Sequence, residues 1–146
     1  MSGFDPEAVR DALVAQLAET IPNTEVYAHD EYSDQYPAIV VRYTDGEFIS
    51  YFESFGPNGY GNIRFDLDIY AGALEDSSAG RVLDRYLTAG SAHPSSVVDA
   101  LLADKTLGGV ATTLNVLNAR GYRKFKDGVM ATIPVDVAAK KVSAQA

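Results

Sequence analysis

Residues 62–70 have the sequence NIRFDLDIY, which predicts one long strand at the centre of the fold. Side chains alternate along an extended backbone, so one face of this strand is apolar and the other carries most of the polar groups. The apolar set is Ile63, Phe65, Leu67 and Ile69, and the opposite set is Arg64, Asp66, Asp68 and Tyr70. The pattern is typical of a strand with one buried face.

Two short helices are expected to follow this strand and to cover its apolar face. Residues 79–87 and 97–102 carry apolar side chains at helical spacing, and residues 90–94 separate the two runs. The apolar positions are Ala79, Val82, Leu83, Tyr86 and Leu87, then Val97, Val98, Leu101 and Leu102. Residues 104–109 are expected to end the second helix, because glycine tolerates the left-handed conformation and Leu107 can pack back onto the last turn.

A further helix is expected near the start of the chain. Asp5 can accept hydrogen bonds from free backbone amides, and Pro6 suits the first helical position. An apolar stripe of Val9, Leu13 and Leu17 follows at four-residue spacing and runs up to Ile21-Pro22.

Residues 25–28 predict a short strand, and the polar, acidic segment 27–36 predicts a loop. Tyrosines punctuate that segment, and two of them, Tyr32 and Tyr36, are candidate interaction residues.

Two hairpins are expected. Residues 38–43 and 47–52 are rich in branched and aromatic side chains, and Asp45-Gly46 between them is a strong signal for a tight turn with positive φ. Leu114 and Val116 indicate another strand, and residues 129–138 alternate cleanly after a turn at Asp127-Gly128. Pro134 cannot donate to a ladder, so its strand is expected at a sheet edge or with that position directed outward.

The order of elements predicts an α+β domain with a mixed, mostly antiparallel sheet and helices packed on one face, because helices and strands do not strictly alternate. Residues 1–139 are expected to form this single domain, since 146 residues favour one core. Residues 140–146 are small and polar and are expected to form a disordered tail.

Composition narrows the class of protein. The sequence has no cysteine, which excludes disulfides and thiolate zinc sites. No apolar run approaches the ~20 residues that span a bilayer, and the first residues lack the basic start and apolar core of a signal peptide. We therefore expect a soluble protein that is not exported by that route and has no membrane partner.

The net charge of −8 is distributed unevenly along the chain. Residues 1–104 hold eighteen acidic and five basic side chains, whereas residues 105–146 hold seven basic and two acidic ones. Such asymmetry suits a protein that meets different partners, or copies of itself, through different faces, although a charged surface also occurs without any such role.

Candidate catalytic groups are few. His29 lies beside Asp30 and Glu31, but adjacent side chains of an extended chain point apart, and His93 precedes Pro94 at a helix entrance where a structural role suffices. No serine, threonine or lysine has a recognisable nucleophile context, so we predict that the protein is not an enzyme and needs no metal or cofactor.

Asp66 and Asp68 form a second candidate site, because alternation places both carboxylates on the polar face of the central strand. If that face is exposed, they keep it soluble. If a neighbouring subunit covers it, Arg64 or a base of the partner must compensate them.

The sharpest local signal is the segment 120–126, RGYRKFK. Its bases are Arg120, Arg123, Lys124 and Lys126, and its aromatic residues are Tyr122 and Phe125. Interleaved bases and rings suit a nucleic-acid contact, because cations meet phosphates and rings stack on bases. In an acidic protein the same hairpin also suits an acidic protein surface, including one on another copy, and we favour that interpretation.

A family resemblance spans the second half of the chain. Phe65-Asp66-Leu67-Asp68-Ile69, Arg81-Val82-Leu83-Asp84, Ser96-Val97-Val98-Asp99-Ala100-Leu101 and Thr106-Leu107-Gly108-Gly109 occur in this order. Together they resemble the tail terminator proteins of long-tailed, siphovirus-type bacteriophages. The tyrosine-rich segment 27–36 and the first third depart from that pattern.

The resemblance implies the same α+β layout and a structural virion protein without covalent chemistry. It implies a ring, usually a hexamer, that caps the tail tube, stops its polymerisation and presents a docking surface for the head. The implied partners are further copies of the chain, the tail tube protein and a head-completion or stopper protein, with possible non-specific contact to DNA in the lumen. The implied location is the tail-head junction of the virion, after assembly in the host cytoplasm.

Two alternatives remain open. Another neck or head-completion protein would share the size, acidity and lack of catalytic groups. A small-ligand-binding or hydrolytic α+β domain would instead show a convergent polar cluster inside a closed apolar pocket.

Overall fold

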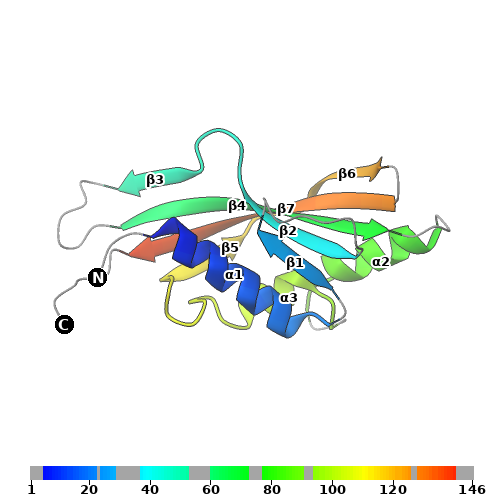
Figure 1. The fold of residues 1–146 in the computed structure, drawn as a ribbon, viewed down its shortest axis with the longest axis horizontal. Helices are drawn as coiled ribbons and strands as arrows, with labels where there is room; N and C mark the ends of the chain where they lie inside the picture. The colour runs from blue at the N-terminus through cyan, green and yellow to red at the C-terminus, as the bar shows by residue number, and fades with distance from the viewer. Residues whose placement is uncertain are drawn as a thin grey trace.

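The computed structural model describes residues 5–22, 24–28, 37–52, 60–72, 77–90, 94–125 and 128–140, which build one sheet and three helices (Figure 1). The helices are α1 (Pro6–Thr20), α2 (Ser77–Leu87) and α3 (Val97–Leu102). The strands are β1 (Glu25–Ala28), β2 (Ala38–Tyr43), β3 (Ile49–Phe52), β4 (Tyr60–Gly72), β5 (Thr113–Val116), β6 (Arg120–Phe125) and β7 (Gly128–Lys140).

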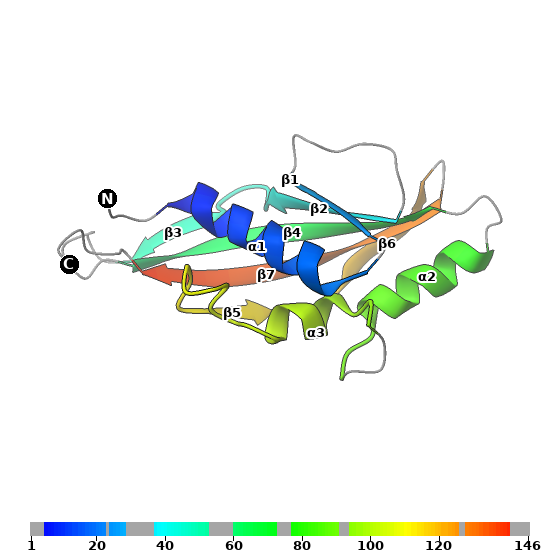
Figure 2. The same cartoon turned by 60° about the horizontal axis from the view of Figure 1, so that its bottom comes forward.

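The sheet is mixed, with the order β1-β2-β4-β7-β5. β3 also pairs with β4, and β6 also pairs with β7. Only the β1–β2 pair is parallel, and the other five strand pairs in the described part of the chain are antiparallel. The three helices lie on one side of the sheet in both views (Figures 1 and 2). This confirms the predicted α+β class.

The core lies between the helices and one face of the sheet. Ile63, Phe65, Leu67 and Ile69 of β4 are fully buried, as the alternation predicts. Their ladder partners on β7 are Val137, Val135, Ile133 and Ala131, so apolar side chains face each other across the two central strands. The helices contribute Val9, Leu13, Leu17, Leu83, Val97, Ala100 and Leu101 to the same cluster. No helix in the described part of the chain is long and apolar enough to span a membrane.

The helix boundaries follow local signals. The Asp5 carboxylate accepts hydrogen bonds from the backbone N of Glu7 at 3.1 Å and of Ala8 at 3.3 Å, and Pro6 begins α1, as predicted. Ser96 caps α3 by accepting from the backbone N of Asp99. Both caps satisfy amides that have no partner inside the helix.

α3 ends at Leu102 with Ala103 as a right-handed cap residue, so the helix does not end at a glycine, contrary to the prediction. Three residues with positive φ lie in the segment 104–109 that follows, which we call the stop after α3. Leu107, Gly108 and Gly109 have φ values of 51°, 72° and 96°. Leu107 is a leucine in the left-handed region, yet its side chain is only 3% exposed and belongs to the core. Leu107 is therefore buried in the core, and this burial offsets the backbone strain.

The first predicted hairpin is wrong. β2 and β3 do not pair with each other; both lie antiparallel to β4, one after the other along the same side. Between them, residues 44–48 form a five-residue excursion opposite Arg64, whose carbonyl accepts from Thr44 N and whose amide donates to the Phe48 carbonyl. Gly46 does take positive φ, at 86°, but the turn serves a bulged strand and not a reversal of chain direction.

The strand predicted at Leu114 and Val116 is β5, and it pairs antiparallel with β7, as expected. The strand β6 was not predicted; it lies between β5 and β7 in the chain and also pairs antiparallel with β7. Asp127 of the predicted turn lies outside the described residues.

The strand β7 is not at an edge, since it pairs with β4 on one side and with β5 and β6 on the other. The Pro134 carbonyl accepts from Leu117 N, so the proline nitrogen also faces residues 117–119, between the ends of β5 and β6. The nitrogen of Pro134 therefore lies opposite the gap between β5 and β6, where no ladder hydrogen bond is needed. This agrees with the prediction that this position is directed outward if its strand is not at an edge.

β7 extends to Lys140, the first residue of the predicted tail, and the rest of that tail lies outside the described residues. His29, Tyr32, Tyr36, His93 and Lys126 also lie outside them.

Candidate functional site: the polar face of the sheet

The side chains of the candidate site lie on the sheet face opposite the helices, which we call the open face. Even-numbered residues of β4 point to this face, because odd-numbered ones fill the core. The register places Arg64 beside Asp136, Asp66 beside Pro134 and Asp68 beside Thr132 of β7. On the other side, β2 places Arg42 beside Asp66 and Val40 beside Asp68.

Asp68 is buried on this face, at 4% exposure, and both of its carboxylate oxygens accept hydrogen bonds. Arg42 Nε donates to Asp68 Oδ2 at 2.5 Å, and Arg42 Nη2 donates to Oδ1 at 3.3 Å. Thr132 Oγ1 donates to the same Oδ1 at 2.6 Å. The two-pronged arginine contact and the hydroxyl satisfy both carboxylate oxygens.

Asp66 is equally buried, at 3% exposure, and joins three elements. Thr44 Oγ1 donates to Asp66 Oδ1 at 2.8 Å. Its Oδ2 lies 3.4 Å from Arg42 Nη2 and 3.3 Å from Arg120 Nη2. Arg42 therefore bridges the two carboxylates, and Arg120 ties the basic strand β6 to the centre of the sheet.

These contacts correct the sequence-based expectation. Asp66 and Asp68 are neither exposed nor in need of a neighbouring subunit for compensation, because Arg42 and Arg120 of the same chain supply it. Arg64, the expected partner within the chain, pairs with Asp136 instead. The sequence pattern did not single out the other members of the cluster, because strand pairing brings them to β4 from distant parts of the chain; they are Arg42, Thr44 and Thr132. Nor did it single out Asp136, which the register of β7 places beside Arg64.

The electrostatics favour a structural role for this cluster. The hydrogen bond to Asp68 is the largest cause that raises the pKa of Arg42 above its usual value, while partial burial opposes it. Every carboxylate oxygen of Asp66 and Asp68 lies at hydrogen-bond or ion-pair distance from an arginine or a threonine. The cluster thus connects β2, β4, β6 and β7 across the open face.

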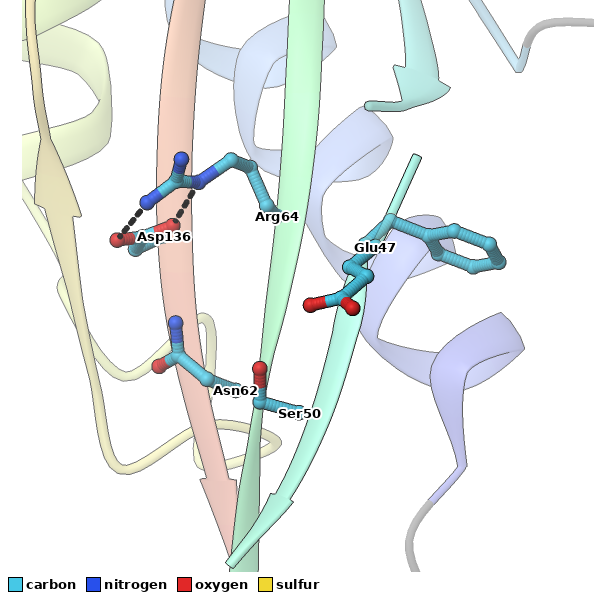
Figure 3. Close-up of a pocket in the computed structure, with 6 residues that line it drawn as sticks. Glu47, Ser50, Asn62, Arg64 and Asp136 are labelled. Atoms are coloured by element: carbon cyan, nitrogen blue, oxygen red, sulfur yellow. Dashed lines mark hydrogen bonds and ion pairs between the residues drawn. The ribbon is translucent and has the colours of Figure 1, made fainter. Parts of the chain in front are cut away.

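A polar pocket lies farther along the open face, beside β3 (Figure 3). Its volume is about 220 Å³, and its lining is Glu47, Phe48, Ser50, Asn62, Arg64 and Asp136. Arg64 Nε and Nη2 donate to the two Asp136 oxygens at 2.7 and 3.0 Å, and this hydrogen bonding raises the pKa of Arg64. Its cation is therefore neutralised within the pocket. Among the described residues, no three His, Cys, Asp or Glu side chains group as a metal site.

The basic strand β6 carries the remaining candidates that the structure describes. A β-bulge between Arg120 and Arg123 pairs these residues with Thr132 and Met130, so both point to the open face although they are three positions apart. Gly121 takes positive φ, at 70°, within this bulge. Tyr122 is 60% exposed, and Arg123 and Lys124 are exposed as well. Phe125 ends β6. Their roles as interaction residues stay predictions.

An apolar groove of about 390 Å³ lies beside β5. Leu102 and Leu117 line it and are 45% and 41% exposed, and Lys105 lies at the same groove. The helical spacing assigned Leu102 to the buried face of its helix, whereas the structure buries Val97 and Leu101 and leaves Leu102 in this groove.

Comparison with known protein families finds no family model that matches this chain, and no curated protein matches it.

Proposed function

We propose that this protein is a structural tail terminator of a long-tailed bacteriophage, which caps the tail tube as a ring, stops tube polymerisation and provides the surface for head docking. Its partners are further copies of itself, the tail tube protein and a head-completion or stopper protein. The proposal starts from the ordered resemblance over residues 65–109, and the α+β fold agrees with the layout that this resemblance implies.

The observation that supports it most directly is the condition of the two buried carboxylates. Asp66 and Asp68 are held by Arg42, Arg120 and two threonines. Such a network of hydrogen bonds and ion pairs stabilises the sheet face on which it lies. A rigid sheet face of this kind suits a subunit that forms fixed contacts with neighbouring subunits.

Two cavities lined by described residues also favour assembly over ligand binding. A small-molecule site usually combines an apolar enclosure with a few convergent polar groups. Here the polar pocket around Arg64 and the apolar groove around Leu102 have different linings and share no residue. The groove adds Lys105, Asn115 and Asn118 to its apolar lining, but both cavities are open at the surface and neither is an enclosed apolar pocket.

The test uses purified full-length protein and tail tubes. We expect native mass spectrometry across a concentration series to show rings, with monomers at high dilution because a modest interface requires mass action. We expect electron microscopy to show one such ring at the head-proximal end of each tube. A chain that stays monomeric at high concentration and never binds a tube end would contradict the proposal.

Loss of the protein separates a tail terminator from another neck component. Tails assembled without a terminator should be abnormally long and unjoined to heads, whereas tails lacking a head-completion protein should have normal length. Normal tail length with failed joining would therefore favour the neck alternative.

A further inference from the structure

The strand registers place an acid and a base at the two ends of a single cross-strand row. Glu25 of β1 is opposite Ala38 of β2, and Ala38 is opposite Tyr70 of β4. Tyr70 is opposite Met130 of β7, and Met130 is opposite Arg123 of β6. Residues in one row share a face, so Glu25 and Arg123 both point to the open face at opposite edges of the sheet.

Both ends of this row are edge strands. Among the described strands, β1 pairs with β2 alone and β6 pairs with β7 alone. An edge strand presents a row of backbone donors and acceptors that a strand of another chain can use. The two edge strands run in opposite directions, because β1 is antiparallel to β4 and β6 is parallel to β4. A continued sheet would therefore join β6 of one copy to β1 of the next in antiparallel fashion.

The two edges differ in charge. Residues 5–28 around α1 and β1 hold five acidic side chains, at positions 5, 7, 11, 19 and 25, and one basic side chain, Arg10. Residues 105–125, which include β5 and β6, hold four basic side chains and no acidic one. Opposite potentials on opposite edges attract copies head to tail and disfavour contacts between like edges.

We propose that β1 of one copy adds to β6 of the next copy, with Glu25 facing Arg123 across the contact. The two surfaces differ, so the contact is heterologous, and repeated rotation can close it into a ring. The inference rests on the proposed function in taking the chain as a self-assembling subunit; what it adds is which two edges meet and which charges pair. Arg120 already forms an ion pair with Asp66. Arg123 Nε, in contrast, donates at 3.4 Å to the neutral Met130 Sδ. Glu25 accepts at 3.4 Å from the neutral Tyr27 hydroxyl. Glu25 and Arg123 therefore both keep their charge for a partner.

A charge exchange tests this contact in the full-length chain. Glu25→Lys and Arg123→Glu each place like charges opposite each other, which should weaken self-association about tenfold at each interface. An equimolar mixture of the two variants should recover association in a ring where the variants alternate. One kind of interface then joins the unchanged Arg123 to the unchanged Glu25, and the other kind joins the two substituted positions, so opposite charges face each other at both. The chain that carries both substitutions should also recover it.

Matched controls are Asp84→Lys and Arg81→Glu, which change charge by the same amounts at exposed positions on α2. They should leave association unchanged, and thermal unfolding should show that all variants fold.

Native mass spectrometry and sedimentation velocity provide the readout. Rings from the wild-type chain together with unaltered association of both edge variants would overturn this contact and leave the proposed function standing. Weakened single variants that recover neither on mixing nor in the doubly substituted chain would also overturn it, since the charges would then act on a different partner. A wild-type chain that forms no ring and binds no tube end would remove both proposals.

Discussion

Arg42 Nε lies 2.5 Å from Asp68 Oδ2, so a residue of β2 neutralises a carboxylate buried in the centre of β4. The same guanidinium reaches Asp66 Oδ2 at 3.4 Å. Arg42 thus contacts both buried acids, Asp66 and Asp68, and its removal should affect folding more than the removal of Arg64 or Arg120.

Replacement of Arg42 should therefore destabilise the protein strongly. Arg42→Ala leaves two buried carboxylates without their main partner. We expect the free energy of unfolding to fall by about 3 kcal/mol, which is the lower end for breaking a buried ion pair. The lower end applies because the arginine side chain is 31% exposed. The measurement is the free energy of unfolding from urea denaturation. Arg64→Ala is the control, and it should cost about 1 kcal/mol or less, because the Arg64 side chain is 46% exposed. Equal decreases in the two variants would contradict the assigned role of Arg42.

The stop after α3 should depend on the buried leucine. Leu107→Ala keeps the positive φ but removes core packing, so the free energy of unfolding should fall by about 2 to 5 kcal/mol. Leu102→Ala removes the same atoms from a side chain that is 45% exposed and should change stability by only about 0.5 kcal/mol. Thermal unfolding of both variants gives the comparison. A larger loss of stability in Leu102→Ala than in Leu107→Ala would contradict this prediction, because packing in the groove would then stabilise the fold more than the burial of Leu107.

Asp104 should make the same stop sensitive to acid. Its carboxylate accepts from Thr106 Oγ1 at 2.6 Å and from the backbone N of Thr106 and Gly108, and these bonds, led by that from the Thr106 side chain, lower the pKa of Asp104 below 3.8. A lowered folded-state pKa means that the ionised form stabilises the fold above the unfolded pKa and that this stabilisation disappears as the pH falls through the folded pKa.

The difference in stability between the wild type and Asp104→Ala should therefore be present at pH 7 and shrink below about pH 4. Urea unfolding of both chains at several pH values measures it. A difference that grows toward acid would contradict the assignment.

The basic strand should act on proteins more than on DNA. Arg123→Ala with Lys124→Ala should leave the free energy of unfolding within about 0.5 kcal/mol of the wild type, because both side chains are exposed. We expect this variant to form rings less readily than the wild type. The salt dependence of any DNA binding should be the same in the two chains. If the strand binds DNA instead, the slope of log K against log salt should fall by about 0.9 for each phosphate that the variant no longer neutralises.

Short-range patterns in the sequence determined several elements of this protein. The Asp5-Pro6 start of α1, the alternation along β4 and β7, and the positive φ at residues 108 and 109 each depend on neighbours within a few positions. Capping, pleating and left-handed turns are local effects, so the sequence is sufficient to predict them.

Only the tertiary structure decided how these elements pair. Asp45-Gly46 carries the local signal of a hairpin, yet β2 and β3 both add to β4, because their apolar side chains pack against the same core. Arg42 and Asp68 are 26 residues apart, and Arg64 and Asp136 are 72 apart. Pairings at such separation follow from strand register, which the burial of a whole sheet face fixes and no short segment encodes.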